Sequence, residues 1–221
     1  MTTRLIAFDL DGTLVDSRQD LADSANALIL ELGGVALPAT TVVTFVGDGA
    51  AALVERALTA AGLESAPAHV RRFLDLYDER LLVHTRLYPG VEALLESAAD
   101  VGRVAVLTNK PASPSERILT GLGIRARVDF LAGGDGPHPR KPDPAGLLAL
   151  MRESGADPDT TLLVGDSHVD RDTARAAGAA FCLVTYGFGR SERASGPREW
   201  VVDDAAAAQV VIRRFAAGGV R

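Results

Sequence analysis

The sequence predicts an α/β protein in which helices pack on a parallel sheet and an all-helical segment follows the first strand. Three observations lead to this fold class. Short apolar runs alternate with helical periodicity after Pro89, whereas helical periodicity alone occurs between residues 17 and 85. Aromatic residues make up 5% of the 221 residues, so the core must be built mainly from Ala, Val and Leu. That composition suits helices packed on a parallel sheet.

The first strand is expected at residues 4–10, where an apolar run ends in the turn-forming sequence Asp-Gly-Thr. Apolar residues then recur at spacings of three and four over residues 17–32, and Gly33 ends this helix. Two further stretches with helical spacing cover residues 53–61 and 70–81. No strand pattern interrupts them, so this region is predicted to be an insert made of helices.

The borders of the insert are expected near Asp16 and at Tyr88-Pro89-Gly90. We therefore predict a core domain formed by residues 1–16 and 86–221, and a separate helical domain formed by residues 17–85.

Beyond Pro89, strands and helices are expected to alternate. The strands are predicted at residues 103–108, 128–132, 161–164, 181–185 and 200–202, and the helices at 91–99, 115–122, 144–154, 170–177 and 205–215. Repeated β-α-β units require a parallel sheet with right-handed crossovers. Ligands bind such sheets at the carboxyl ends of the strands, so functional residues are expected there.

Composition and charge argue against several classes of protein. The formal charge is −6 and no long basic run occurs, so a nucleic-acid partner is not expected. The first residues are too short an apolar stretch for a signal peptide or a membrane span, so we expect a cytoplasmic protein with no membrane partner. The single cysteine, Cys182, lies in an apolar run and is interpreted as a buried structural thiol.

Polar residues follow three of the predicted strands. They are Asp9 and Asp11, then Thr108 with Asn109, and finally Asp166. A single aspartate at a strand end is usually a turn former or a helix cap, but residues of this kind at several strand ends together predict one site.

Clustered carboxylates need a cation between them, because like charges about 4 Å apart cost roughly 4 kcal/mol at an effective dielectric of 20. Oxygen ligands without a nearby cysteine favour Mg²⁺. His168 adjoins Asp166, but with His138 as its other nearby candidate we interpret it as a neutral loop histidine and do not expect zinc.

Lysine is rare and its placement is informative. Of 23 Lys and Arg residues, Lys110 and Lys141 are the two lysines, and both lie beside strand-end motifs. A compact ammonium group is therefore expected to be needed at both positions, unless the placement is chance.

Four segments together resemble the motifs of the haloacid dehalogenase-like hydrolase superfamily. They are DLDGTLVDS at residues 9–17, TN at 108–109, KPDP at 141–144 and GDSHVD at 165–170. The first and last form a specific combination, whereas TN or KP alone would be weak. The resemblance implies a Rossmann-like parallel sheet core and makes the insert an all-helical cap domain over the site.

The resemblance also implies roles for individual residues. Asp9 would be the nucleophile, Asp11 the general acid and base, and Lys141 the cation that contacts both Asp9 and the phosphate. Mg²⁺ would be held by Asp9, Asp11 through its backbone carbonyl, and Asp166, with Asp170 as a supporting carboxylate behind them. The expected substrate-binding residues are Thr108, Asn109, Gly12 and Arg56.

Chemistry supports these implied roles. A carboxylate that attacks a phosphate dianion meets strong repulsion, which Mg²⁺ and an ammonium group would neutralise. The product would be an aspartyl phosphate. Asp11 could protonate the departing alkoxide and then activate water, and its presence argues against dehalogenation, since a departing halide needs no proton. We therefore expect a magnesium-dependent phosphatase of a small phosphorylated metabolite.

Two further segments resemble the bacterial phosphoglycolate phosphatase family, at residues 46–62 and 133–144. Asp48 stands where that family commonly has Asn. Its charge would disfavour a substrate that carries a carboxylate, unless Asp48 merely caps the following helix. Arg56 on that helix is the candidate partner for such a carboxylate, with a place on the solvated face as the alternative.

Other interpretations stay open. On the same scaffold they are a sugar-phosphate or amino-sugar-phosphate phosphatase, an inorganic pyrophosphatase and β-phosphoglucomutase. A phosphonoacetaldehyde hydrolase is discounted, because it needs a lysine in the cap for a Schiff base and residues 17–85 contain none. A binding protein that keeps the fold without activity is disfavoured, because Asp9, Asp11, Lys141 and Asp166 are all present.

Overall fold

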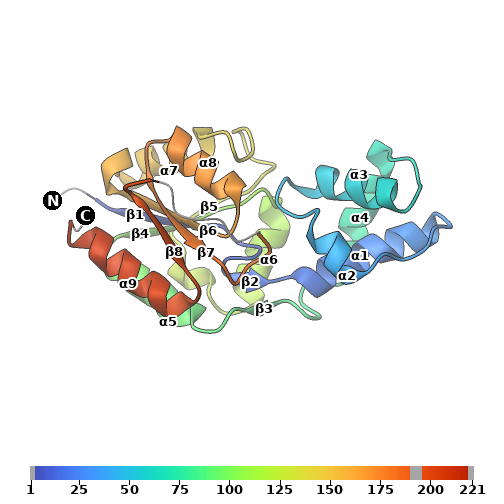
Figure 1. Ribbon diagram of the computed structural model, residues 1–221, viewed down its shortest axis with the longest axis horizontal. Coiled ribbons are helices and arrows are strands. Elements are labelled where there is room, and N and C mark those ends of the chain that lie inside the picture. Colours follow the sequence, from blue (N-terminus) through green and yellow to red (C-terminus); the bar gives the residue numbers. More distant parts are fainter. Residues whose placement is uncertain (1–2, 190–195, 219–221) are drawn as a thin grey trace.

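The computed structural model describes residues 3–189 and 196–218, and it confirms the α/β class. The described residues form a six-stranded parallel sheet in the order β5-β4-β1-β6-β7-β8 and a small two-stranded ribbon of β2 and β3. In Figure 1 the sheet with its covering helices occupies one end of the molecule, and helices α1 to α4 form a separate group at the other end. No helix among the described residues combines the length and the apolar character that a membrane crossing requires.

The bounds of the elements are as follows. The strands are β1 (Leu5–Phe8), β2 (Val15–Asp16), β3 (Arg86–Leu87), β4 (Arg103–Leu107), β5 (Phe130–Ala132), β6 (Thr161–Gly165), β7 (Ala180–Val184) and β8 (Glu199–Val202). The helices are α1 (Arg18–Glu31), α2 (Ala39–Val43), α3 (Ala50–Ala60), α4 (Pro67–Asp78), α5 (Val91–Ala99), α6 (Ala112–Gly121), α7 (Ala145–Ser154), α8 (His168–Ala176) and α9 (Ala205–Ala216). Single 3₁₀ turns occur at Arg125–Arg127 and Pro158–Thr160.

The central strand β1 is buried on both faces. Its side chains alternate, so Ile6 and Phe8 belong to one apolar cluster and Leu5 and Ala7 to another. Helices α5 and α9 cover the first face, and α7 and α8 cover the second (Figure 1). A strand buried in this way must be apolar throughout, which is why it reads as a continuous apolar run.

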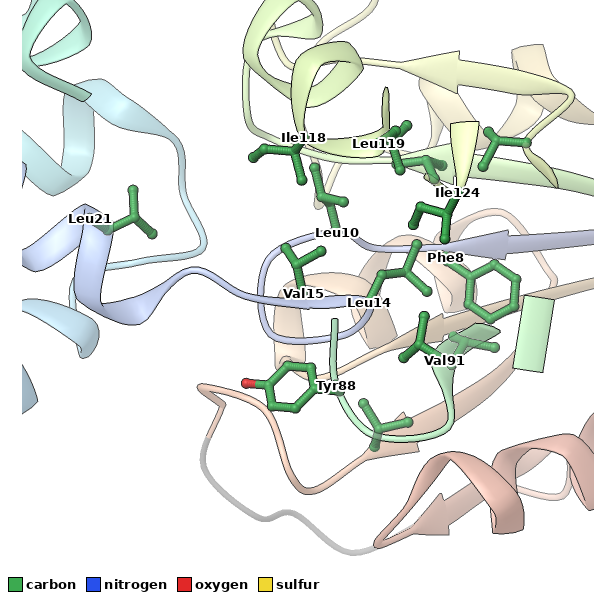
Figure 2. Packing of buried hydrophobic residues seen from close by; sticks show 14 of the residues in the cluster. Phe8, Leu10, Leu14, Val15, Leu21, Tyr88, Val91, Ile118, Leu119 and Ile124 are labelled. Carbon is green, nitrogen blue, oxygen red and sulfur yellow. The ribbon is translucent and has the colours of Figure 1, made fainter. Parts of the chain in front are cut away.

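A second group of buried residues anchors the loop that follows β1. Leu10, Leu14 and Val15 are fully buried and pack with Ile118 of α6 and with Val91 of α5 (Figure 2). The amides of Leu14 and Val15 both donate to the carbonyl of Leu10, at 3.0 Å each, which closes the loop on itself. The backbone around Asp9 and Asp11 is therefore held by packing on both sides.

The helical insert joins the core through the ribbon of β2 and β3. In this antiparallel pair Val15 lies opposite Leu87, and Asp16 lies opposite Arg86. Sequence analysis did not predict these strands, because two residues are too few to show an alternating pattern, and it also missed the five-residue helix α2. We propose that the ribbon marks the border between the predicted core and cap domains.

Asp20 of α1 fastens the insert to the chain that returns toward β3. This carboxylate is 1% exposed, and it accepts hydrogen bonds from the backbone amides of His84 (2.9 and 3.1 Å) and Thr85 (2.8 Å). The hydroxyl of Thr85 also donates to it, at 2.7 Å. Without Asp20 these donors would lose their hydrogen-bond acceptor.

We expect the Asp20→Asn variant to be destabilised by about 1 to 3 kcal/mol, because an amide NH₂ would replace an acceptor and leave a buried donor unsatisfied. Urea unfolding measures this change. Asp23→Asn is the matched control on the same helix, since Asp23 accepts a solvent-exposed hydrogen bond from Gln19 and should change stability by less than about 0.5 kcal/mol. Equal losses in the two variants would contradict the anchoring role of Asp20.

Candidate active site

Residues after three neighbouring strands meet at the carboxyl edge of the sheet. Asp9 follows β1, Thr108 follows β4 and Asp166 follows β6, and β1 is paired with both of the other strands. The ladder continues past the strand ends, because the amide of Asp9 donates to the carbonyl of Val164 at 2.9 Å. The sequence-based expectation that these strand ends lie together is therefore met.

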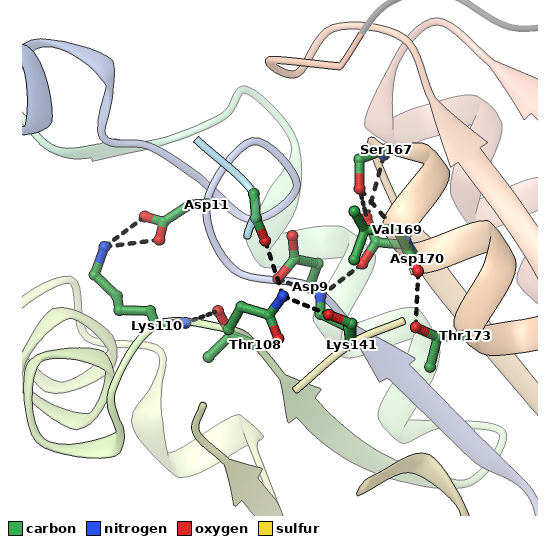
Figure 3. A network of polar contacts seen from close by, with 11 residues as sticks. Asp9, Asp11, Thr108, Lys110, Lys141, Ser167, Val169, Asp170 and Thr173 are labelled. Atoms are coloured by element: carbon green, nitrogen blue, oxygen red, sulfur yellow. Dashed lines mark hydrogen bonds and ion pairs between the residues drawn. The ribbon is translucent and has the colours of Figure 1, made fainter. Parts of the chain in front are cut away.

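Lys141 lies between two carboxylates at the centre of the site. Its Nζ is 2.8 Å from Oδ1 of Asp9 and 2.6 Å from Oδ1 of Asp170 (Figure 3). Burial alone would lower the pKa of Lys141, but the charges of Asp170 and Asp9 outweigh it and raise the pKa. Lys141 is thus held as an ammonium ion against Asp9.

The second carboxylate oxygen of Asp170 is hydrogen-bonded to Ser167 at the start of α8. Its Oδ2 accepts from the hydroxyl of Ser167 at 2.6 Å and from the amide of Ser167 at 3.2 Å. Ser167 in turn caps the helix through the amide of Asp170. Both oxygens of Asp170 therefore have partners, and the carboxylate acts as a fixed support for Lys141.

Three carboxylates approach one another closely enough to share a cation. One oxygen each from Asp9, Asp166 and Asp170 lies within 4.8 Å of the others. Burial raises the pKa of Asp9 to about 8; the charge of Lys141 opposes this shift, and the charges of Asp170 and Asp166 add to it. Burial and the charge of Asp170 likewise raise the pKa of Asp166 to about 6, although two backbone amides oppose this.

This group fits a hard divalent cation. The donors are all carboxylate oxygens, and one oxygen from each of the three lies close enough to the others to share an ion. Oδ2 of Asp166 is fixed by the amides of Phe188 (2.6 Å) and Gly189 (3.0 Å). Gly12 leaves room beside it, because a Cβ at Gly12 would overlap the Asp166 carboxylate.

A cavity of about 610 Å³ opens above these residues, between the core and the helical insert. Asp9, Asp11, Thr108 and Asp166 line its floor, and residues of the insert, including Phe73, line its other wall. A small phosphorylated molecule can be enclosed in a space of this size.

Asp11 is turned away from Asp9. Its carboxylate receives the Lys110 ammonium group at 2.7 and 2.9 Å and the Ser17 hydroxyl at 2.5 Å. Figure 3 shows Asp11 pointing toward Lys110, with Asp9 on the opposite side. The two aspartates of the first motif thus have separate cationic partners, Lys141 for Asp9 and Lys110 for Asp11.

Thr108 and Asn109 lie at the cavity in different situations. The hydroxyl of Thr108 accepts from the amide of Lys110 at 3.2 Å. The side-chain NH₂ of Asn109 donates to the carbonyls of Gly47 and Lys141, at 2.9 Å each, and its Oδ1 is buried without a partner among the described residues. Asn109 therefore ties a turn of the insert to the loop that carries Lys141.

The structure places Arg56 at the cavity in an ion pair. Its NH2 is 2.5 Å from Oδ2 of Asp48, and its NH1 donates to the carbonyl of Phe45 at 3.3 Å. Asp48 is thus neutralised by Arg56. The sequence alone does not indicate that these two residues pair.

Sequence reasoning missed Ser17 and Tyr77 as neighbours of the site. Tyr77 looked like one more apolar residue of a helix, yet its ring lies 4.5 Å from the ammonium group of Lys110. Nothing local distinguishes such a residue, whereas the rarity of lysine did single out Lys110.

Cys182 lies away from the site in β7, where burial raises its pKa to about 12, in keeping with a structural thiol.

Comparisons with known proteins agree with this fold and show its family. Residues 3–178 match the family model described as haloacid dehalogenase-like hydrolase. The phosphoglycolate phosphatase of Rhodospirillum rubrum is 40% identical over 210 residues, which cover 91% of this chain and 87% of the relative. The phosphoglycolate phosphatase of Haemophilus influenzae is 38% identical over 212 residues, which cover 91% of this chain and 94% of the relative.

Among solved structures, a predicted phosphoglycolate phosphatase from Haemophilus somnus superposes with a TM-score of 0.87 at 34% identity, over 96% of this chain and 98% of that chain. The chain therefore belongs to the haloacid dehalogenase-like hydrolase family.

We expect Gly12→Ala to abolish divalent-ion binding and to reduce hydrolysis at least 100-fold, because its Cβ would push the Asp166 carboxylate out of place. Isothermal titration with Mg²⁺ and a phosphate-release assay measure the two effects. Gly33→Ala is the control, since Gly33 also has a positive φ but nothing lies within 4 Å of its Cβ position. It should cost about 1 to 3 kcal/mol of stability through backbone strain and leave ion binding intact. Loss of binding in both variants would show that strain alone is responsible.

Proposed function

We propose that this phosphatase hydrolyses phosphoglycolate, in a magnesium-dependent reaction that passes through a phosphorylated Asp9. The observation that carries the proposal is the contact of Lys141 with Asp9 at the floor of the cavity, beside a group of carboxylates that fits a divalent cation. The names of the relatives support the choice of substrate.

Asp9, Asp166 and the backbone carbonyl of Asp11 are the proposed ligands of Mg²⁺. Asp170 is less suited, because Lys141 and Ser167 already occupy both of its oxygens. The ion would supply positive charge against the phosphate oxygens. Gly12 leaves space for the Asp166 carboxylate, and the amides of Phe188 and Gly189 hold it in place for this purpose.

In the first half-reaction an oxygen of Asp9 forms a bond to phosphorus, and the bond between phosphorus and the ester oxygen breaks. Lys141 keeps the Asp9 carboxylate oriented and offsets the charge of the incoming phosphate. Asp11, which must take up a proton from water when it leaves its ion pair with Lys110, gives that proton to the departing glycolate oxygen. Thr108 and Asn109 are the proposed contacts for phosphate oxygens from the core side.

In the second half-reaction Asp11 takes a proton from a water molecule, which attacks phosphorus. The bond between phosphorus and the Asp9 oxygen breaks, and inorganic phosphate is released with Asp9 restored as a carboxylate. Asp11 has returned to its protonated form, so the cycle is balanced. The insert forms one wall of the cavity in which the phosphorylated Asp9 would lie.

The ion pair between Arg56 and Asp48 bears on the substrate. A free Asp48 would repel a substrate that carries a carboxylate, but the pair leaves little net charge at this position. A phosphate ester with a neighbouring carboxylate therefore remains compatible with the cavity. Sugar phosphates and pyrophosphate are the alternatives, and ranking kcat/KM across metabolite phosphates distinguishes among them.

We expect the wild-type chain to release phosphate from phosphoglycolate with added Mg²⁺ and to stop when the ion is chelated. Asp9→Asn should show no turnover while unfolding at nearly the same temperature, because it keeps the size of the side chain and removes the nucleophile. Malachite-green detection of phosphate and thermal unfolding provide the two measurements. Substantial activity in the purified variant would falsify the role of Asp9.

Asp11→Asn should discriminate among leaving groups. We expect turnover of phosphoglycolate to fall by roughly 10²- to 10⁴-fold, because the alkoxide needs a proton to depart. The first step with 4-nitrophenyl phosphate should suffer much less, since nitrophenolate leaves without full protonation. A stopped-flow burst of nitrophenolate separates this step from hydrolysis of the phosphorylated Asp9. An equal slowing of the first step for both substrates would remove Asp11 from the acid role.

A further inference from the structure

A site selective for phosphoglycolate needs a hydrogen-bond donor or a cation for the substrate's carboxylate, and a cation gives the stronger contact. Lys141 is committed to Asp9 and Asp170 beneath the floor of the cavity. Among the described residues, the permanently charged cations that line the cavity are Arg56 and Lys110. The choice between these two cations decides where the non-reacting end of the substrate lies.

Arg56 is the weaker candidate. Its side chain is 44% exposed, and its guanidinium contacts Asp48 and the carbonyl of Phe45. A second carboxylate placed there would have to compete with Asp48 for the same guanidinium group. An exposed ion pair of this kind also gives little discrimination, because water screens it.

Lys110 has the opposite character. Its side chain is 6% exposed, and its ammonium group lies between the Asp11 carboxylate and the face of the Tyr77 ring. A desolvated ammonium of this kind binds a carboxylate more strongly than an exposed one does. Two ammonium contacts, at 2.7 and 2.9 Å, already hold a carboxylate in this position.

We infer that Lys110 forms the subsite for the carboxylate of the substrate, and that in this structure the side chain of Asp11 occupies that subsite. The inference rests on the proposed function, in which the substrate is a small phosphate ester that carries a carboxylate. Lys110 would belong to the substrate-binding residues in place of Arg56.

Tyr77 provides an independent observation at the same place. Its hydroxyl is buried at the cavity beside the Lys110 ammonium group, and no acceptor for its proton lies within hydrogen-bonding geometry among the described residues, although a buried phenol normally has one. A carboxylate bound to Lys110 would give this hydroxyl an acceptor. Because Tyr77 lies on α4, the contact would also link the substrate to the insert.

Replacement of Asp11 by the substrate carboxylate on Lys110 would also affect catalysis. A substrate carboxylate that takes the place of Asp11 on Lys110 releases Asp11 to move toward the leaving group. A phosphate ester without a carboxylate gives no such compensation, so Asp11 must leave Lys110 at a net cost. Selectivity should therefore appear in kcat as well as in KM.

The test compares phosphoglycolate with 2-hydroxyethyl phosphate, which has a neutral hydroxymethyl group in place of the carboxylate. In wild type we expect kcat/KM to favour phosphoglycolate. Lys110→Met should reduce that preference by roughly 10- to 100-fold, as expected for a lost charge-assisted contact. Arg71→Met, which removes an exposed arginine on the helix that carries Tyr77, is the control and should leave the preference unchanged.

Two more variants complete the design. Tyr77→Phe removes the hydroxyl but keeps the ring, and it should reduce the preference by about threefold to tenfold. If Lys110→Met does not fold, the Tyr77→Phe variant still tests the proposed subsite. Calorimetric titration of both esters into Asp9→Asn, with and without Lys110→Met, tests binding without turnover and should show the same loss of preference.

The outcomes are distinct. If Arg56→Met abolishes the preference and Lys110→Met does not, the inference is overturned. A second pair, 2-phospholactate and isopropyl phosphate, separates the inference from the choice of substrate. If phosphoglycolate is not hydrolysed but this pair shows selectivity that depends on Lys110, the proposed substrate fails and the subsite stands. If wild type prefers the carboxylate in neither pair, the subsite is overturned, whichever ester it hydrolyses.

Discussion

The ammonium group of Lys141 lies between the carboxylates of Asp9 and Asp170, and the geometry of the site depends on this buried contact. Parallel strands deliver several carboxylates to one edge, where like charges about 4 Å apart repel by roughly 4 kcal/mol at an effective dielectric of 20. One lysine offsets part of this charge and fixes the direction of Asp9. Asp9, Asp166 and Asp170 together carry more negative charge than Lys141 alone offsets, and their arrangement fits a divalent cation.

The loop that carries Lys141 is also connected to the helical insert. Asn109 donates to the carbonyl of Lys141 and to that of Gly47, so one amide group joins the loop of the central cation to a turn of the insert. Asp20 fastens the other end of the insert to the chain that enters β3. The cavity wall therefore has two polar attachments, and displacement of the insert would break the contact of Asn109 with Gly47.

The two lysines show how burial assigns different roles to the same residue type. Lys141 has a second carboxylate, Asp170, which is itself fixed by the cap of α8, so its position is set by the core alone. Lys110 has one carboxylate and an aromatic ring that belongs to the insert. Its surroundings can change when the insert or the ligand changes, whereas those of Lys141 cannot without disturbing the core.

Most of the fold could be predicted from the sequence, because the signals are local. A strand that is buried on both faces must be continuously apolar, as β1 is, and a helix on its face must repeat its apolar residues every three or four positions. The strand-end residues Asp9, Thr108 and Asp166 could be assigned to one site for the same reason, since parallel strands end at one edge. The ribbon of β2 and β3 could not, because two residues show no period.

The tertiary structure alone decided which partner each polar side chain has. Lys110 and Asp11 are 99 positions apart in the chain, and Asn109 and Gly47 are 62 apart, so no local pattern relates them. Composition identified two unusual lysines, and position on a predicted helix identified a candidate arginine. Neither could show that Arg56 pairs with Asp48 or that Tyr77 covers Lys110. Sequence determines the elements and the chemistry available at their ends, because both depend on neighbouring residues. The pairing of charges depends on distances and burial, which exist only once the insert has packed against the core.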